Sequence, residues 1–411
     1  MEINKTRLQQ HFEAMSLIGK IGETGTNRPA HSTEEKKAFE LTAQWMQDAG
    51  MKTHIDSFGN LIGRLEGKNN SLPVLMMGSH LDSQPYGGRF DGVAGVLCAV
   101  EVVKTLYDNN IMPERSIEII SFADEEGWRF NKGLFGSRGI LGKLEEGELQ
   151  RKDKDGITRE QALKNFGCDI TKFKQDEYKQ NSIYCFLELH IEQGPVLDIA
   201  HKPIGVVSGI SGPLWATLKL KGMAGHAGSV PMALRKDALV GAAEIIIALN
   251  EIATQIPGAP TVGTVGTLNI FPASRNIIPE EVTLTIDLRD IDLERRHKYE
   301  KQFKEKIEAT AKKHGLTYSL TEDTNSEPRY CANWIKEIIH TQCKQLNIDA
   351  PELMSGPFHD SLPLSYATDY GMIFIRSKDG ISHNPLEYSS YEDLALGTTV
   401  LLRTVTEILK R

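Results

Sequence analysis

The chain has 411 residues and a formal net charge of −8, and it lacks long basic runs, which argues against nucleic acid or an anionic membrane as a partner. Hydrophobic residues make up 40% and charged residues 25% of the chain, as in globular proteins of about two domains. No apolar stretch approaches the ~18 residues of a membrane span. Five cysteines without a Cys-x-x-Cys pair, and a polar start without a signal-peptide core, predict a cytoplasmic protein with reduced thiols.

The first part of the chain is predicted to alternate helices and short strands. A helix and a glycine-rich loop occupy residues 1–30, and Ser32 and Glu35 have the spacing of a capping box at the start of a second helix. The elements predicted after Ser32 are a helix at 33–49, edge strands at 52–56 and 60–65, a buried strand at 73–77 and a helix at 93–106.

The loop between that strand and that helix, residues 78–92, carries His80, Asp82 and Asp91. These side chains follow the carboxyl end of a strand, which is where open α/β sheets place their ligands. An imidazole and two carboxylates suit a divalent metal ion. For the His-x-Asp pair alone, a polar loop with a helix-capping aspartate is the more frequent explanation.

Three later predicted strands also lead into residues that can bind metals. They are residues 116–122 before the triplet Asp-Glu-Glu at 124–126, residues 183–189 before His190, and residues 371–376 shortly before His383. A single acidic triplet is more often a solvated turn. Because four strands deliver such groups at the same end, we predict a metal site there. The charged segment 141–182 shows weak helical patterns, and we expect no chemistry in it.

Residues 213–324 have a different pattern from the rest of the chain. The predicted order is a strand at 215–220, a helix at 236–254, strands at 262–270 and 282–288, a helix at 293–314 and a strand at 316–320. This order, βαββαβ, predicts a ferredoxin-like sandwich. The fourth ligand-bearing strand follows it, so residues 213–324 form an inserted domain. Residues 1–212 and 325–411 then form one catalytic domain, which ends in helices, the last at 390–410.

Together the motifs resemble the M20 metallopeptidase family, and within it the hydantoinase/carbamoylase branch, over nearly the whole chain. They are Gly-Ser-His-Leu-Asp at 78–82, Gly-Gly-Arg-Phe-Asp-Gly at 87–92, Asp-Glu-Glu-Gly at 124–127, Glu-Leu-His-Ile-Glu-Gln-Gly at 188–194, Gly-His-Ala-Gly at 225–228 and Ile-Ser-His-Asn-Pro at 381–385. The resemblance implies an α/β fold with a mixed-sheet, phosphorylase/hydrolase-like catalytic domain. It also implies that the inserted ferredoxin-like α+β domain serves as a lid and dimerisation domain.

The resemblance further implies two divalent metal ions (Zn, Mn, Co or Ni) about 3.5–4 Å apart. The implied ligands are His80, Asp91, Glu126, His190 and His383. Asp91 would bridge the two ions, and the division of the other ligands between them stays open. Asp82 would orient the imidazole of His80, and Glu125 would act as the general base.

Substrate contacts are implied as well, to a small molecule with a free carboxylate. His226 would stabilise the developing oxyanion, and further substrate contacts would come from Gln193, Asn276, Arg289 and His359. A structural loop histidine and a surface ion pair are the alternatives for His226 and Arg289. Pro357 and Phe358 stand where the branch has small residues, so we expect a different pocket shape beside His359. Family members often share inserted-domain residues across subunits, which implies a homodimer.

The implied reaction is hydrolysis of the ureido C–N bond of an N-carbamoyl-L-amino acid, releasing the amino acid, carbon dioxide and ammonia. Allantoate amidohydrolase, with the same chemistry in purine degradation, is the alternative. A metallo-aminopeptidase of the same family is disfavoured by Asn276 and Arg289, which suit a free carboxylate. An inactive binding or scaffolding protein is disfavoured because Glu125 and every ligand position are present.

Overall fold

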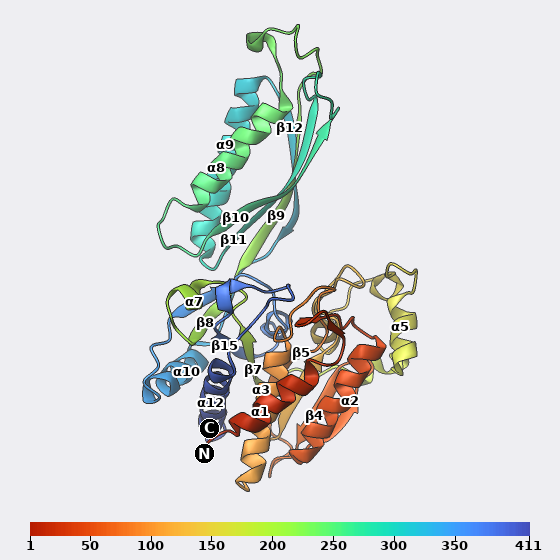
Figure 1. Cartoon of the computed structure of the whole chain (residues 1–411), viewed down its shortest axis with the longest axis vertical. Helices are drawn as coiled ribbons and strands as arrows, with labels where there is room; N and C mark the ends of the chain where they lie inside the picture. The colour runs from red at the N-terminus through yellow and green to blue at the C-terminus, as the bar shows by residue number, and fades with distance from the viewer. The chain divides into compact units, whose positions relative to one another are not determined.

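The computed structural model describes every residue from Met1 to Arg411, and the chain divides into two compact units (Figure 1). Unit 1 comprises Met1–Ser208 and Cys331–Arg411, and unit 2 comprises Gly209–Tyr330. The predicted limits of the inserted domain, residues 213 and 324, lie a few residues inside unit 2. No helix in the chain combines the length and the apolar character needed to cross a membrane.

A large mixed sheet of nine strands runs in the order β13-β8-β15-β7-β5-β6-β4-β3, with β14 paired to β8. Its strands are β3 (Lys52–Ile55), β4 (Leu61–Leu65), β5 (Val74–His80), β6 (Ile117–Phe122), β7 (Ile183–Ile191), β8 (Ile204–Ile210), β13 (Arg329–Tyr330), β14 (Glu352–Ser355) and β15 (Asp369–Ile375). The four central strands β15, β7, β5 and β6 are parallel to one another. Their carboxyl ends therefore meet at one edge of the sheet, as the four ligand-bearing strands require.

Helices cover the central strands, and β5 and β6 are buried along their whole length, as is typical of parallel strands. On the sheet, α3 packs against β5 and β7, and α12 packs against β15. The helices of unit 1 are α1 (Lys5–Met15), α2 (Thr33–Asp48), α3 (Val93–Asp108), α4 (Phe135–Gly139), α5 (Arg159–Phe166), α6 (Phe173–Asp176), α7 (Val196–Ile199), α10 (Asn333–Gln345), α11 (Ser361–Leu364) and α12 (Tyr391–Ile408). Ser32 caps α2 by accepting a hydrogen bond from the N–H of Glu35, which confirms the predicted helix start.

Shorter elements complete the chain. A two-stranded ribbon is formed by β1 (Lys20–Ile21) and β2 (Gly25–Thr26), and Thr26 also pairs with Gly87 of the predicted metal loop. Single 3-10 turns occur at Glu148–Gln150, Ile170–Lys172, Met232–Leu234 and Lys378–Gly380.

The structure differs from the sequence prediction in several places, of which three concern the large sheet. The prediction of β4 as an edge strand is wrong, because β4 hydrogen-bonds to β3 on one side and to β6 on the other. Strand β8 was not predicted, although it pairs antiparallel with β15. His80 is the last residue of β5, and His190 lies within β7, so both histidines are on strands and not in loops. A strand restrains its side chains more firmly than a loop does, which favours a preformed site.

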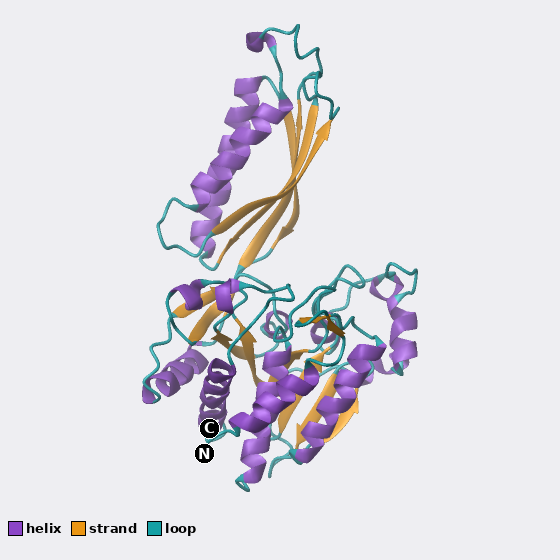
Figure 2. Cartoon of the chain, in the orientation of Figure 1, coloured by secondary structure: helices purple, strands orange, loops and turns teal.

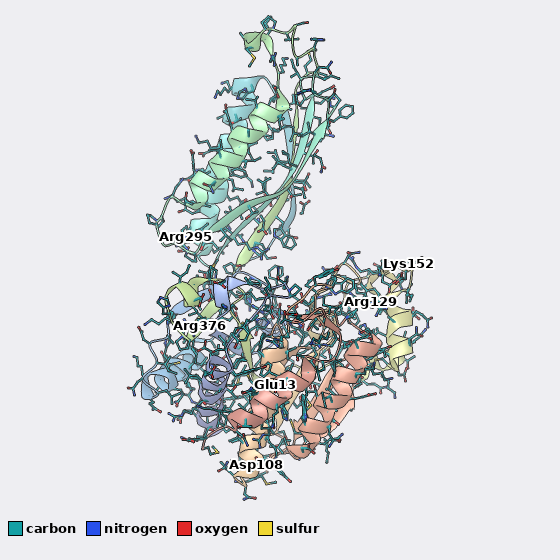
Figure 3. The ribbon with its side chains drawn as sticks, in the orientation of Figure 1. Glu13, Asp108, Arg129, Lys152, Arg295 and Arg376 are labelled. Carbon is teal, nitrogen blue, oxygen red and sulfur yellow. The ribbon has the colours of Figure 1, made fainter.

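Unit 2 has the order β9 (Gly212–Lys221), α8 (Ala238–Ala253), β10 (Val262–Phe271), β11 (Glu281–Asp290), α9 (Leu293–His314) and β12 (Thr317–Asn325). Its antiparallel sheet has the order β10-β11-β9-β12, the strand order of a ferredoxin-like sandwich. Both helices pack on one face of this sheet (Figure 2), around a core that includes Leu218, Ile245, Leu284 and Phe303. Near the start of α9, Arg295 (labelled in Figure 3) donates to Asp290 at the end of β11 over 2.7 Å.

Candidate metal centre

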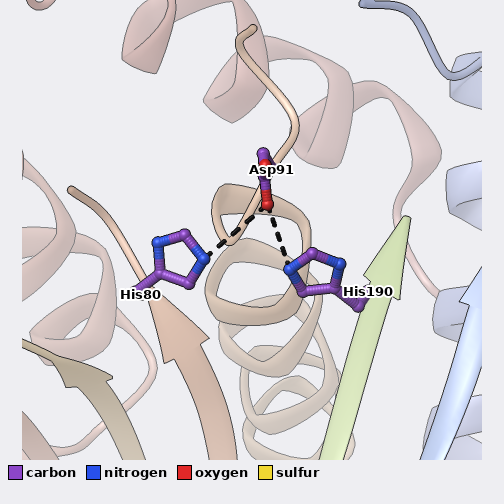
Figure 4. Close-up of side chains that lie close together, drawn as sticks. All are labelled: His80, Asp91 and His190. Carbon is purple, nitrogen blue, oxygen red and sulfur yellow. Dashed lines mark ion pairs between the residues drawn. The ribbon is translucent and has the colours of Figure 1, made fainter. Parts of the chain in front are cut away.

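The predicted metal-binding side chains of unit 1 meet at the carboxyl edge of the central strands. Figure 4 shows His80 and His190 on neighbouring strands, on either side of Asp91. Asp91 lies in the loop before α3, and the next residue, Gly92, has φ of +66°. A Cβ atom at Gly92 would lie 2.4 Å from a ring carbon of His80, so glycine alone allows this close approach.

The two carboxylate oxygens of Asp91 face two different groups of side chains. Oδ1 lies 3.7 Å from Nε2 of His80 and 3.2 Å from Nε2 of His190. Oδ2 lies 3.1 Å from Nε2 of His383, which is 3.5 Å from Oε2 of Glu126. Within each group the possible ligand atoms lie within 4.8 Å of one another. The structure thus divides the candidate ligands into two sets of three that share Asp91.

The hydrogen bonds of two imidazoles show that the first group suits a cation. Nδ1 of His80 lies 3.0 Å from the carbonyl oxygen of Asp82, and Nδ1 of His190 lies 2.9 Å from that of Ile191. A carbonyl oxygen only accepts, so each Nδ1 carries a proton and a neutral ring turns its bare Nε2 towards Asp91. Lone pairs on nitrogen and carboxylate then face each other, which a cation between them would stabilise. The donor set therefore fits a divalent metal ion.

The pKa shifts of the side chains in the site also favour a bound cation. Burial raises the pKa of Glu126 to about 7, and the nearby Asp91 acts in the same direction. Burial also raises the pKa of Glu125 well above its usual range, although His80 opposes this effect. For His80, burial would lower the pKa, but the carboxylates of Glu125, Asp82 and Asp91 outweigh it and raise that pKa well above its usual value, so a positive charge at Nε2, carried by a proton or by a metal ion, is favoured. The site holds an excess of buried negative charge, which bound cations would offset.

Asp82 connects two strands of the site. Its Oδ1 accepts from the backbone N–H of Glu125 and its Oδ2 from the backbone N–H of Glu126, each over 3.3 Å. Oδ1 also lies 3.5 Å from Nδ1 of His80. One buried carboxylate thus holds the turn with the two glutamates in place beside His80.

Sequence reasoning missed Arg159, which lies in the segment where no chemistry was expected. Arg159 is fully buried, donates to Oδ2 of Asp124 over 2.6 Å and to Oε1 of Glu148 over 3.0 Å, and lies against the rings of Phe130 and Phe135. Asp124 has φ of +53° and precedes the two glutamates, so Arg159 stabilises an unusual backbone turn. The sequence did carry a signal. Arg159 lies at helical spacing from Ala162, Leu163 and Phe166, on the buried face of α5.

Two predicted substrate contacts in unit 1 differ in their access. Gln193 donates from Nε2 to Oδ2 of Asp91 over 2.9 Å, so its side chain reaches the centre. His359 is buried beside His190, with ring centroids 4.4 Å apart, and its Nε2 lies 2.7 Å from Oγ of Ser355. On the other side of the site His383 is 49% exposed, which leaves the second group open.

The ring of His359 also belongs to a third cluster of possible ligands, with Glu188 and His190. The carboxylate of Glu188 already accepts from the hydroxyl groups of Ser79 and Ser361, over 2.8 and 2.7 Å. We therefore regard this cluster as part of the hydrogen-bonded framework behind His190.

The predicted substrate contacts of unit 2 lie at two ends of its sheet. His226 accepts at Nδ1 from the N–H of Gly228 over 3.0 Å, which leaves the proton of a neutral ring on Nε2. Asn276 lies close to His226, because the backbone carbonyl oxygen of Asn276 accepts a hydrogen bond from the N–H of Ala227. Arg289 is at the other end of β11 and forms an ion pair with Asp287 over 2.8 Å. An ion pair is the alternative to substrate binding that the sequence left open for Arg289.

The fold and the paired His–carboxylate groups define a mixed α/β enzyme with a candidate metal centre. A family model described as Peptidase family M20/M25/M40 matches residues 76–407, and the chain belongs to this family, which confirms the resemblance in the motifs. The chain is 46% identical to an N-carbamoyl-L-amino-acid amidohydrolase of Pseudomonas sp. (strain NS671), with 98% of each chain covered. It is 34% identical to an allantoate deiminase of Arabidopsis thaliana, covering 93% of this chain and 79% of that one. A solved structure of a hydantoinase/carbamoylase family amidase from Burkholderia multivorans matches with a TM-score of 0.91 and 31% identity, over 99% of this chain and 98% of that one.

Proposed function

We propose that this protein is an amidohydrolase that cleaves the ureido C–N bond of an N-carbamoyl-L-amino acid. The observation that carries the proposal is the pair of candidate metal-binding groups sharing Asp91, with Glu125 beside them. The 46% identity to an N-carbamoyl-L-amino-acid amidohydrolase supports this choice of substrate. Allantoate is the second candidate, supported by the 34% identity to an allantoate deiminase.

The two groups would hold one divalent ion each (Zn, Mn, Co or Ni). His80, His190 and Asp91 form one set, and Glu126, His383 and Asp91 form the other. When bound, such ions polarise a carbonyl oxygen and lower the pKa of bound water towards ~7. The side-chain amide of Gln84 donates to Oε2 of Glu126 over 2.7 Å, which orients this carboxylate as a ligand.

Glu125 is the group we assign to proton transfer. Oε2 of Glu125 lies 3.6 Å from Nε2 of His80, at the face that the other ligands share. A carboxylate whose pKa is raised by burial is a stronger base than an exposed one. Glu125 would take a proton from the attacking water and pass it to the departing nitrogen, while Asp82 keeps the backbone of Glu125 in position.

Unit 2 would supply the remaining contacts to the substrate. His226 presents Nε2–H, the kind of donor that stabilises a developing oxyanion. Asn276 and Arg289 would bind the carboxylate. In the pairing of β9 with β11, Lys221 is opposite Glu281 and Pro213 is opposite Arg289. At ~3.3 Å per residue, residues 281 to 289 span roughly 26 Å along the sheet. Asn276 lies before this stretch, beside the bridge between Ile277 and His226, so it is at least as far from Arg289.

One chain therefore cannot place Asn276 and Arg289 on the same carboxylate. We propose a homodimer in which each active site receives one end of unit 2 from each subunit. Strand β10 is an edge of the sheet, and it exposes Val262 and Phe271, while the adjacent helix α8 exposes Val240 and Ile247. An open edge with apolar neighbours favours pairing with a second copy. The five buried free cysteines suit the reducing cytoplasm.

The reaction is tested by measuring ammonia release from N-carbamoyl-L-amino acids and from allantoate, with a dipeptide assayed for peptide cleavage. The protein is first stripped of metal and then reloaded with Zn, Mn, Co or Ni. We expect no activity without metal, recovery with at least one ion, and the highest kcat/KM on an N-carbamoyl-L-amino acid. Full activity of metal-free protein would exclude the proposed mechanism, and a preference for allantoate would establish the second candidate.

Sharing of the site is tested with mixed dimers of inactive chains. Glu125→Gln is combined with His226→Ala in one mixture and with Arg289→Ala in another, under conditions in which subunits exchange. Because His226 and Arg289 lie at opposite ends of unit 2, we expect one mixture to regain up to half of normal activity per mixed dimer and the other to stay inactive. Recovery in neither mixture, with exchange verified by mass, would show that each chain builds its own site.

A further inference from the structure

A buried carboxylate outside the proposed ligand set connects the loops that carry Asp91 and His383. Glu387 is 1% exposed and lies four residues after His383. Its Oε1 accepts from the backbone N–H of Phe90 over 2.9 Å and from that of Asp91 over 3.1 Å. Its Oε2 accepts from the hydroxyl of Ser382 over 2.8 Å. One side chain thus holds the backbone of the shared carboxylate and the residue next to His383.

The hydroxyl of Ser382 also connects the loop of Asp91 with the loop of His383. Oγ of Ser382 lies 3.3 Å from Oδ2 of Asp91, the oxygen that faces His383. The backbone of Asp91, its carboxylate and the residue before His383 are therefore all in contact with Glu387 or with its hydrogen-bond partner.

The packing beside Glu387 leaves no room for a side chain at position 88. Gly88 lies directly against it, and a Cβ atom at position 88 would be 2.1 Å from Oε1 and 2.3 Å from Cβ of Glu387. Both glutamate atoms would have to move, so any larger residue at position 88 would displace the whole side chain. The absence of a side chain at Gly88 thus leaves the space that the Glu387 side chain occupies.

We infer that Glu387 is a positioning residue that sets the orientation of the Asp91 carboxylate relative to His383 and so preforms the second metal-binding group. The inference rests on the proposed metal centre. Asp91 serves two groups at once, so a rotation of its backbone changes both, but only the second group also contains His383. Loss of Glu387 should therefore weaken metal binding most at the group Asp91–Glu126–His383.

Glu101 is a suitable control because it is equally buried and makes similar hydrogen bonds elsewhere. Its carboxylate accepts from the backbone N–H of Asn4 and from the guanidinium of Arg7, each over 2.7 Å. Removing it should destabilise the fold without touching the loops of the site.

The test is a titration of metal-free, full-length protein with cobalt(II), followed by calorimetry and by native mass spectrometry, with thermal unfolding of the metal-free form measured in parallel. We expect the wild type to bind two ions and Glu387→Ala to bind one of them about 10–100-fold more weakly, the usual effect of removing a group that orients a ligand. Gly88→Ala should give a similar loss although Glu387 is present. Glu387→Gln keeps an acceptor for both N–H groups and should recover most of the affinity.

Glu101→Ala should lower the unfolding temperature and bind cobalt as the wild type does. Equal binding of both ions by the wild type and Glu387→Ala would overturn the inference, as would a similar loss of affinity in Glu101→Ala. If Glu387→Ala does not fold, unchanged affinity in Gly88→Ala overturns it instead. A wild type that binds no metal would overturn the proposed function together with the inference, so the two failures are distinguishable.

Discussion

Replacing Asp82 by asparagine tests how the site is held together. The carboxylate of Asp82 is completely buried and accepts one backbone N–H with each oxygen, from Glu125 and from Glu126. Asparagine keeps the shape but offers one oxygen and one NH2 group. One of the two N–H groups would then face a donor and lose its partner.

The magnitude follows from these contacts. A buried N–H left without an acceptor costs about 1–3 kcal/mol, so the free energy of unfolding of the metal-free protein should fall by that amount. The turn with Glu125 and Glu126 would shift relative to His80, whose Nδ1 also lies 3.5 Å from Asp82. A change of this kind behind metal ligands lowers metal affinity by about 10–100-fold, and we expect that loss as well.

Glu192 provides the matched control, because its two oxygens accept from the successive N–H groups of Val196 and Leu197 over 2.7 and 2.8 Å. Glu192→Gln removes the same kind of hydrogen bond at the start of α7. Urea unfolding and metal titration of both variants are compared. Both should lose similar stability, and only Asp82→Asn should lose metal affinity. Equal metal affinity in the two variants would refute the role of Asp82 in connecting His80 to the glutamate turn.

Three further predictions concern other residues of unit 1. In Glu125→Gln, kcat should fall by ~10²–10⁴ with metal content unchanged, as for a lost general base, and a variant that loses metal but keeps its rate per ion would mean that Glu125 and Glu126 exchange roles. Arg159→Met should lower the free energy of unfolding in urea by about 3–5 kcal/mol, because Asp124 loses its buried partner, and a loss below about 1 kcal/mol would contradict the ion pair. Burial lowers the pKa of His31 from 6.5 to about 3, with Arg159 acting in the same direction, so His31 is neutral in the folded protein and gains a proton on unfolding below pH 6.5. Between pH ~6.5 and ~3, stability should therefore fall by up to about 1.4 kcal/mol per pH unit relative to His31→Asn, and parallel pH profiles of the two proteins would exclude this effect.

The sequence by itself was enough to predict most elements and to single out the side chains that meet at the candidate metal centre. Apolar runs and helical spacing depend on a few neighbouring residues, which is why α9 begins and ends where its pattern does and why β5, β6, β7 and β15 were recognised. Parallel strands place their carboxyl ends together, so the order of strands along the chain was sufficient to expect His80, His190 and His383 at one edge of the sheet.

The tertiary structure decided what depends on contacts between distant residues. The two oxygens of Asp91 divide the candidate ligands into two groups, which spacing along the chain does not encode. Glu387 binds the N–H of Phe90 from 297 residues away, and Arg159 reaches Asp124 from a segment with weak helical patterns. Such hydrogen bonds form only after the sheet has brought the loops together, because a buried carboxylate or guanidinium takes whichever partners packing places within about 3 Å.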